Sequence, residues 1–351
     1  MDNISPLAPQ EHPHGIPGTQ PSTRGVVKLT YSPKLMSTTH RLPTPPHVSL
    51  KPLPTEDSKA STPENTLLSI DGAIRAGAHA LELDLHISRD GIVVLSHDAS
   101  LMRCYGIKKK VIDCDWEYLK TLRTLQAPHE PMPRLIDVLE YLSQPGREDF
   151  WILLDIKLTN EPFTIMDLIS KTIDLVPSTA PWHRRIVLGC WSARYLPARA
   201  QHLPQYAVTL ICVDVSYARQ FLQVPLVSFN INQMILMGPL GRGFLDEARA
   251  TGRQVYVWTV NAPNLMRWCI RHEIDGVISD EPGRFRQVCE GWEKEHSGVL
   301  GGLNPNLDRI PLRQRIEIIA VALYVIWFGW ILKRMDLTPV ERLAIEERKS
   351  R

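Results

Sequence analysis

Residues 80–98, ALELDLHISRDGIVVLSHD, contain the pattern that decides the fold class of this chain. Every second residue from 81 to 85 is a leucine, and Glu82 and Asp84 lie between them. Side chains alternate between the two faces of a strand, so the leucines share one face and the carboxylates share the other. Two buried like charges are costly unless a cation or a hydrogen-bonding partner compensates them. The next apolar run ends in His97. The segment therefore predicts two strands that carry a polar site.

Strand-like and helix-like segments alternate from about residue 63 to 290. The expected strands are 79–85, 92–96, 150–156, 185–190, 206–213, 226–231, 254–260 and 275–279, and the expected helices include 67–76, 135–142, 163–176 and 243–251. This alternation is typical of βα units around a parallel sheet. Eight strands favour a TIM-type (β/α)8 barrel over an open doubly wound sheet. No GxGxxG or Walker-type glycine loop occurs, which argues against a nucleotide-binding protein.

Polar residues follow several of the expected strands. Asp155 and Lys157 lie at the end of the 150–156 run, and Trp258 lies near the end of another run. A parallel barrel brings the carboxyl ends of its strands to one rim, where catalytic residues gather. Together with the two carboxylates of the first strand, Asp155 would make an oxygen-rich site of the kind that Mg²⁺ or Ca²⁺ prefers. Taken singly, His97 or Lys157 would be an ordinary loop or surface residue, so only the combination predicts a site.

The composition excludes several classes of protein. The chain has 351 residues and a formal net charge of +2, without a dense basic stripe, so we expect no nucleic acid partner. Its six cysteines are scattered and form no CxxC pair, which indicates a reducing compartment rather than a disulfide framework. Nothing in the sequence predicts the oligomeric state.

The two ends of the chain differ from its middle. We expect a disordered, proline-rich leader over 1–58, a barrel over 59–295, a linker over 296–315, a membrane anchor helix over 316–335 and a charged tail over 336–351. Residues 318–332 carry no charge and would form a helix of about 22 Å, slightly short of a hydrocarbon core. An interfacial helix and a buried core helix are the alternatives. An anchor would place the barrel on the cytosolic surface of the endoplasmic reticulum, a mitochondrion or a lipid droplet.

The joint pattern of short motifs resembles the glycerophosphodiester phosphodiesterases. The motifs are Pro63-Glu64-Asn65-Thr66, Glu82-Leu83-Asp84, His97-Asp98, Leu154-Asp155-Ile156-Lys157, Val257-Trp258-Thr259-Val260-Asn261 and Asp275-Gly276-Val277-Ile278-Ser279-Asp280. The resemblance covers roughly residues 60–290. The form of the fourth motif and the apolar segment near the carboxyl terminus look most like the fungal phosphatidylglycerol phospholipase C subgroup.

The resemblance implies a TIM-type barrel, a divalent metal (Mg²⁺ or Ca²⁺) and hydrolysis of glycerol phosphodiesters. By position, the metal ligands would be Glu82, Asp84, Asp155 and Glu64. His97 would be one of two acid–base histidines, and Lys157 and Trp258 would line the substrate site. Asp155 stands where many members have a glutamate, so its shorter side chain could alter the placement of the ion.

The chain departs from the family pattern just before Pro63. The family carries His-Arg-Gly about eight residues upstream of this position, where Thr55-Glu56-Asp57 stands instead. His40 begins the only upstream His-Arg pair. Either His40 enters the site across an inserted loop, with 48–53 as a poor first strand, or the first histidine is missing.

Three functions remain open at this level. The favoured one is a membrane-anchored, metal-dependent hydrolase of a glycerophospholipid, plausibly phosphatidylglycerol, that yields diacylglycerol and glycerol phosphate. The second is a catalytically impaired barrel that binds lipid or regulates. The third is a phospholipase D-like lipase that cleaves on the headgroup side of the phosphate.

Overall fold

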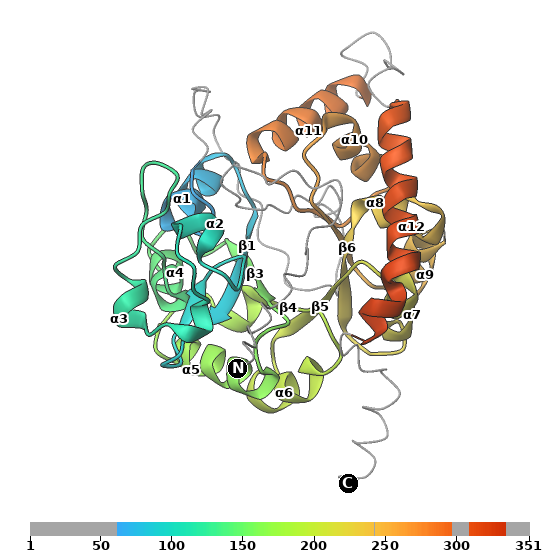
Figure 1. Ribbon diagram of the computed structural model, residues 1–351. Coiled ribbons are helices and arrows are strands. Elements are labelled where there is room, and N and C mark those ends of the chain that lie inside the picture. The colour runs from blue at the N-terminus through green and yellow to red at the C-terminus, as the bar shows by residue number, and fades with distance from the viewer. Residues whose placement is uncertain (1–61, 242, 297–308, 335–351) are drawn as a thin grey trace, which may run out of the picture.

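The computed structural model describes residues 62–241, 243–296 and 309–334 of the chain. The strands are β1 Ala80–Ile87, β2 Val93–Leu95, β3 Trp151–Ile156, β4 Ile186–Cys190, β5 Ala207–Cys212, β6 Val227–Asn232, β7 Val255–Trp258 and β8 Gly276–Val277. The main helices are α1 Leu67–Arg75, α4 Leu135–Leu142, α5 Pro162–Asp174, α6 Tyr195–His202, α7 Val215–Phe221, α8 Gln233–Met237, α9 Phe244–Ala250, α10 Pro263–Arg271, α11 Pro282–His296 and α12 Leu312–Arg334. Helices surround a curled sheet (Figure 1).

The eight strands form one sheet in the order β2-β1-β3-β4-β5-β6-β7-β8. The pairs from β1–β3 through β7–β8 are parallel, and β1 and β2 pair antiparallel. The predicted TIM-type barrel is therefore confirmed, and each of the eight expected strands is present. Among the described strands, none joins β8 to β1. The possible first strand at 48–53 and the leader lie outside the described residues.

Strand β1 has the two faces that its sequence predicts. Leu81, Leu83 and Leu85 pack in the hydrophobic core between the sheet and its surrounding helices. Glu82 and Asp84 occupy the opposite face, which is the barrel interior, and both are buried. Across the β1–β3 pair, Asp84 lies directly opposite Asp155, so two carboxylates face one another in register.

Strand β2 corrects one expectation. The 92–96 run was expected to be one of the strands of a parallel sheet, but it turns back and pairs antiparallel with β1 through Leu85 and Leu95. The turn needs Gly91, whose φ of +82° lies in the left-handed region that favours glycine. A three-residue strand carries no sequence signal for its direction. As a result, the chain after β2 starts beside Asp84, where the Ser96 amide donates to the Asp84 carbonyl at 2.9 Å.

Residues 96–134, called here the β2–α4 insertion, form a small lobe with its own core. It contains α2 Met102–Tyr105, the 3₁₀ turn Val111–Asp113 and α3 Trp116–Leu119. Leu101, Val111 and Leu119 are fully buried in that core. The Arg89 amide, just past the carboxyl end of β1, donates to the Cys114 carbonyl at 2.9 Å. The insertion therefore lies at the mouth of the barrel, the end where the carboxyl ends of the parallel strands meet.

The expected helices are present, with sequence signals at their ends. Thr66 caps α1 by accepting from the Ser69 amide, and Pro162 begins α5 at a position where its missing amide costs nothing.

All six cysteines are free, as the scattered spacing indicated.

Helix α12 differs from the predicted membrane anchor. Ile318, Ala322 and Val325 form a buried face, and Val321 and Val325 pack against the core that includes α8. Within the described residues, no helix combines the length and apolar character needed to cross a membrane. The prediction of a spanning helix is thus not supported, because one face of α12 is committed to contact with the barrel. The 336–351 tail and residues 297–308 of the expected linker lie outside the described residues.

Candidate active site

Two carboxylates converge on one ammonium group at the mouth of the barrel. Lys157 Nζ lies 2.6 Å from Asp84 Oδ1 and 2.6 Å from Asp155 Oδ2. Asp84 comes from β1, Asp155 from β3, and Lys157 from the loop that follows β3. Glu82 lies two residues before Asp84 on the same strand face. Two carboxylates therefore share a single lysine here, with a third carboxylate on the same strand face as Asp84.

Asn65 fixes the orientation of Asp84. Its Nδ2 donates to Asp84 Oδ2 at 2.8 Å, and its Oδ1 accepts from the Asp84 amide at 3.2 Å. Asn65 is buried and has a φ of +51°, a backbone conformation that asparagine tolerates better than most residues. With Lys157 on Oδ1 and Asn65 on Oδ2, both oxygens of Asp84 are held in place.

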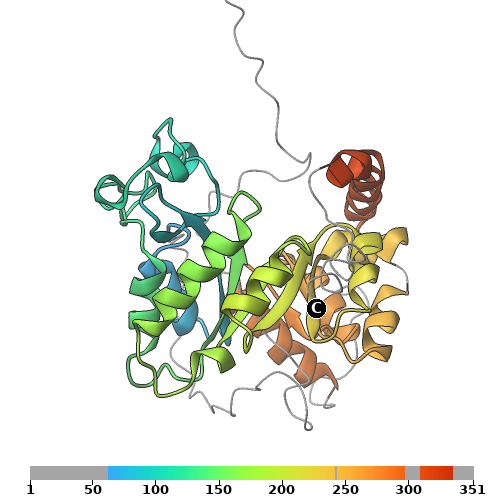
Figure 2. The ribbon, with the colours of Figure 1, turned by 90° about the horizontal axis from the view of Figure 1, so that it is seen from below.

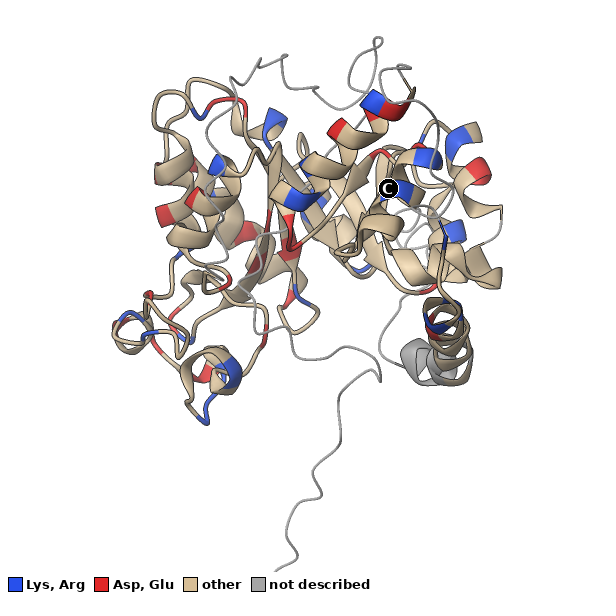
Figure 3. Cartoon of the chain, turned by 90° about the horizontal axis from the view of Figure 1, so that it is seen from above, with Lys and Arg blue, Asp and Glu red and all other residues tan. Residues whose placement is uncertain are grey.

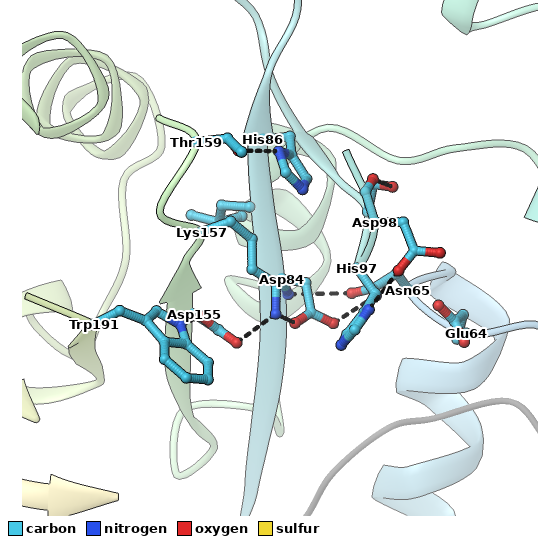
Figure 4. A network of polar contacts seen from close by, with 12 residues as sticks. Glu64, Asn65, Asp84, His86, His97, Asp98, Asp155, Lys157, Thr159 and Trp191 are labelled. Carbon is cyan, nitrogen blue, oxygen red and sulfur yellow. Dashed lines mark hydrogen bonds and ion pairs between the residues drawn. The ribbon is translucent and has the colours of Figure 1, made fainter. Parts of the chain in front are cut away.

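A chain of ion pairs holds His97. Its Nδ1 lies 2.8 Å from Asp98 Oδ1, while Arg103 Nε donates to Asp98 Oδ2 at 2.6 Å. Arg103 also binds both carboxylate oxygens of Glu64, at 2.7 and 2.5 Å. An ionised carboxylate can only accept, so Nδ1 of His97 donates and Nε2 keeps its lone pair in the neutral ring. Figure 4 shows the His97, Asp84, Lys157 and Asp155 side chains in one region.

The charges of this chain reinforce one another. Burial acts to raise the pKa of Asp98, but the hydrogen bonds from His97 and Arg103 outweigh it and hold the pKa well below its ordinary value. The hydrogen bonds to Glu64 raise the pKa of Arg103. Asp98 therefore stays ionised at neutral pH and remains an acceptor for His97.

Two tryptophans line the other side of the carboxylate pair. Trp191 Nε1 donates to Asp155 Oδ1 at 2.7 Å, so Asp155, like Asp84, has both oxygens bound. Trp258 meets Trp191 edge to face, with 5.8 Å between the ring centroids. Trp258 Nε1 donates to the Asn230 carbonyl, which leaves the partly exposed ring beside the site. Trp258 is thus linked to Asp155 through Trp191, and its role in lining the substrate site stays a prediction.

His86 shares the interior face of β1 with Glu82 and Asp84. Its Nδ1 lies 3.3 Å from Thr159 Oγ1, and the residue is only 5% exposed. Burial, and then the nearby Lys157 ammonium, lower the pKa of His86. The imidazole is therefore neutral at pH 7. His86 is not among the predicted site residues, although alternation along the strand already places it on the carboxylate face.

Apart from His97 and Trp258, the predicted site residues fall into three groups. Asp84, Asp155 and Lys157 are in contact, with Glu82 on the same strand face. Glu64 was predicted as a metal ligand or further site carboxylate; its oxygens bind Arg103, and its role toward a metal stays a prediction. His40 lies outside the described residues, so its role stays a prediction.

Sequence reasoning missed the residues that position others. Asn65, Asp98 and Trp191 each bind a predicted site residue, and Arg103 joins Asp98 to Glu64. Asn65 and Asp98 stand inside quoted motifs, so their positions could have been used. Arg103 and Trp191 carry no local signal, because only the fold brings them to their partners.

The residues present suit a divalent cation in charge and in ligand type. Glu82, Asp84 and Asp155 offer hard carboxylate oxygens, and two of them already share one cation, the Lys157 ammonium. In the described part of the chain, no three His, Cys, Asp or Glu side chains stand close enough to form a ready metal cluster. Binding of an ion between Asp84 and Asp155 would therefore require Lys157 to leave its bridging position.

Comparison with known proteins agrees with this geometry. The model of the glycerophosphoryl diester phosphodiesterase family matches residues 58–284. A glycerophosphodiester phosphodiesterase of Bacillus altitudinis is 22% identical over 237 residues, which are 66% of this chain and 95% of the relative. Lysophospholipase D GDPD1 of Homo sapiens is 25% identical over 272 residues, which are 65% of this chain and 82% of the relative.

Solved structures share the fold. A glycerophosphoryl diester phosphodiesterase from Silicibacter pomeroyi superposes with a TM-score of 0.59 at 18% identity, over 66% of this chain and 90% of the other. An Oleispira antarctica phosphodiesterase, solved in complex with the product sn-glycerol-3-phosphate, gives a TM-score of 0.57 at 20% identity, over 66% and 94%. Enzymes of this family typically depend on a divalent metal. The chain belongs to the glycerophosphoryl diester phosphodiesterase family and is a phosphoric diester hydrolase.

Proposed function

We propose that the chain hydrolyses a glycerophospholipid, with phosphatidylglycerol as the preferred substrate, to diacylglycerol and glycerol phosphate. The observation that carries the proposal is the convergence of Asp84 and Asp155 on one cation, in the same site as a histidine oriented by Asp98. A phosphodiester needs its negative charge neutralised and its leaving oxygen protonated, and this site holds groups for both tasks.

Each residue has a distinct task in this proposal. Asp84, Asp155 and Glu82 would hold Mg²⁺ or Ca²⁺, which neutralises the phosphodiester when bound. His97 exchanges a proton with the reacting oxygen through Nε2, since Asp98 occupies Nδ1. Lys157, released from its two carboxylates, turns its ammonium to a phosphate oxygen. The Trp258 ring packs against the apolar part of the glycerol moiety.

Two rivals make different predictions. An impaired barrel would bind lipid without turnover, because the second histidine expected upstream of Pro63 is replaced by Thr55-Glu56-Asp57. A phospholipase D-like lipase would break the other phosphate ester bond and release phosphatidic acid. The relatives named lysophospholipase D make this second rival worth a direct product analysis.

The test uses the purified full chain with Mg²⁺ or Ca²⁺. We expect turnover of both phosphatidylglycerol and soluble glycerophosphocholine, with diacylglycerol as the lipid product from the first. Asp84→Asn and His97→Ala should each abolish most of it, whereas Asp115→Asn, a surface carboxylate paired with Arg89, should not. Turnover of neither substrate would overturn the proposal, and phosphatidic acid as product would favour the second rival.

The proposal places the enzyme at the cytosolic surface of the endoplasmic reticulum, a mitochondrion or a lipid droplet, where its substrate lies. Fractionation of cells that express the full chain tests this. Recovery of the chain away from all membranes would remove this part of the proposal while leaving the chemistry untouched.

A further inference from the structure

Helix α12 has two apolar faces, one packed on the barrel and the other exposed. Ile318, Ala322 and Val325 are buried against it. On the opposite side, Leu312, Ile316, Ile319, Leu323 and Trp327 form a continuous stripe, and each is more than half exposed. Their spacing of three and four residues places them on one helix face. This stripe is called here the α12 stripe.

Basic residues flank the α12 stripe in its first turn. Arg313 and Arg315 are exposed and, at 100° per residue, lie on either side of the stripe. Glu317 pairs with Arg313 at 3.0 Å and offsets part of this charge. A helix with an exposed apolar stripe edged by arginines has the composition of one that lies in a membrane interface.

The β2–α4 insertion also exposes apolar and basic side chains. Met102, Ile112 and Leu125 are 46%, 54% and 60% exposed. Lys108, Lys109 and Lys110 are exposed on the same lobe. This group is called here the insertion patch. Figure 3 shows basic segments both on this lobe and on α12.

Both surfaces lie at the mouth of the barrel. Helix α12 contacts α8 and the 3₁₀ turn Pro239–Gly241, which follow the carboxyl end of β6. Asn264, at the start of α10 after β7, donates to Gln314 Oε1 at 2.6 Å. In Figure 2, α12 (red) and the insertion (teal) project beyond the rest of the barrel on the same side, and Figure 3 agrees. The carboxylates and the lysine of the candidate site lie at this same mouth.

We infer that the α12 stripe and the insertion patch together dock the enzyme on an anionic lipid bilayer, with the mouth of the barrel facing the headgroups. The charge selects this partner: the exposed arginines and lysines beside apolar side chains suit a surface of anionic headgroups over acyl chains. Docking at two points on either side of the mouth fixes the tilt of the barrel. The inference rests on the proposed function, because a lipid substrate reaches the site only in this orientation.

The experiment measures binding of the full chain to vesicles that contain no substrate. Vesicles of phosphatidylcholine mixed with phosphatidylserine are compared with vesicles of phosphatidylcholine alone. We expect the double variant I319E/L323E to bind the mixed vesicles at least about tenfold more weakly, since two apolar side chains leave the acyl region. The double variant K108Q/K110Q should bind about fivefold more weakly for each charge removed, and only at low salt.

Matched controls come from the opposite end of the barrel. Leu175 and Leu226 are 70% and 84% exposed, at the carboxyl end of α5 and before β6. L175E and L226E should bind vesicles like the wild type. All variants should hydrolyse soluble glycerophosphocholine at the wild-type rate, which separates docking from catalysis and confirms that each variant is folded.

Three results would overturn the inference. The first is that I319E/L323E and K108Q/K110Q both bind each kind of vesicle as tightly as the wild type does. The second is equal weakening by the control variants. The third is a wild-type dimer in sedimentation that I319E/L323E converts to a monomer without loss of vesicle binding, which would make the α12 stripe a contact between copies. If the wild type binds mixed vesicles as expected but hydrolyses no substrate, the docking surface stands and the proposed function fails.

Discussion

Replacement of Asp98 by asparagine tests whether the chain of ion pairs positions His97 for catalysis. Asp98 accepts from His97 Nδ1 at 2.8 Å and from Arg103 Nε at 2.6 Å. Asparagine has nearly the same shape but only one acceptor oxygen, and its NH₂ group meets one of the two donors. The variant therefore loses one charge-assisted hydrogen bond and the negative charge beside His97.

The expected size of the effect differs between activity and stability. A hydrogen bond to a charged group contributes about 1.5–3 kcal/mol, and about 1.4 kcal/mol corresponds to a tenfold change in rate. We therefore expect the kcat of D98N to fall about 10- to 100-fold, with a small change in KM. The side chains of His97, Asp98 and Arg103 are 47%, 33% and 37% exposed, so solvent screens their attraction. The free energy of unfolding should change by no more than about 1 kcal/mol.

The assay is steady-state hydrolysis of soluble glycerophosphocholine, with urea unfolding measured in parallel. D115N is the matched control, because Asp115 lies in the same β2–α4 insertion as Asp98 and pairs with Arg89. H97A sets the lower limit, at about 10²- to 10⁴-fold below the wild type. If D98N keeps wild-type kcat while H97A does not, orientation of His97 by Asp98 is not needed. A loss of stability large enough to explain the loss of activity would also refute the reasoning.

Three further predictions concern the site and the fold. In K157M the carboxylates Asp84 and Asp155 lose their shared ammonium, so Mg²⁺ should raise the Tm of K157M more than that of the wild type, while kcat falls about 100-fold. The control is K171M, which removes an exposed lysine paired with Asp167. Equal Mg²⁺-induced shifts in the Tm of K157M and of the wild type would contradict the expectation. R185M should lower the free energy of unfolding, measured by urea denaturation, by about 3 kcal/mol or more, because the buried Arg185 guanidinium donates to three backbone carbonyls. The control is R184M, since Arg184 is exposed. Because the pKa of His86 is lowered in the folded state, the unfolded chain binds a proton below about pH 6.5 that the folded chain does not, so the free energy of unfolding falls as the pH drops through this range. In H86Q the urea midpoint should fall less between neutral and mildly acidic pH than it does in the wild type. An equal fall in both proteins would exclude His86 as the source of the pH dependence.

The sequence predicted the parts of the fold that repeat. Apolar runs located every described strand, and helix-like spacing located α1, α4, α5 and α9. The direction of β2 was missed because three residues carry no information about their partner. The α12 interface was missed for a related reason: its sequence is apolar on all sides, so nothing distinguishes the face that packs on the barrel.

The site residues that stand in local sequence motifs could be predicted from the sequence. Glu82 and Asp84 stood out because carboxylates in a strand are costly, and Asp155 and Lys157 stood out through a strand end. Arg103 could not be found this way. It lies far from Glu64 in the sequence, and a single arginine in the short helix α2 has no sequence pattern that distinguishes an arginine with two carboxylate partners from an ordinary surface residue.

The register of β1 against β3 has a consequence for how the barrel assembles. Asp84 lies directly opposite Asp155, and like charges in that position oppose strand pairing. A slip of one residue would set Asp84 against Leu154 and turn its side chain away from the site. The same slip would also turn Leu81, Leu83 and Leu85 away from the core, so the buried leucines hold the strands in register. Lys157 offsets the repulsion in this alignment by binding both aspartates, so a residue of the candidate site also stabilises the pairing of β1 with β3.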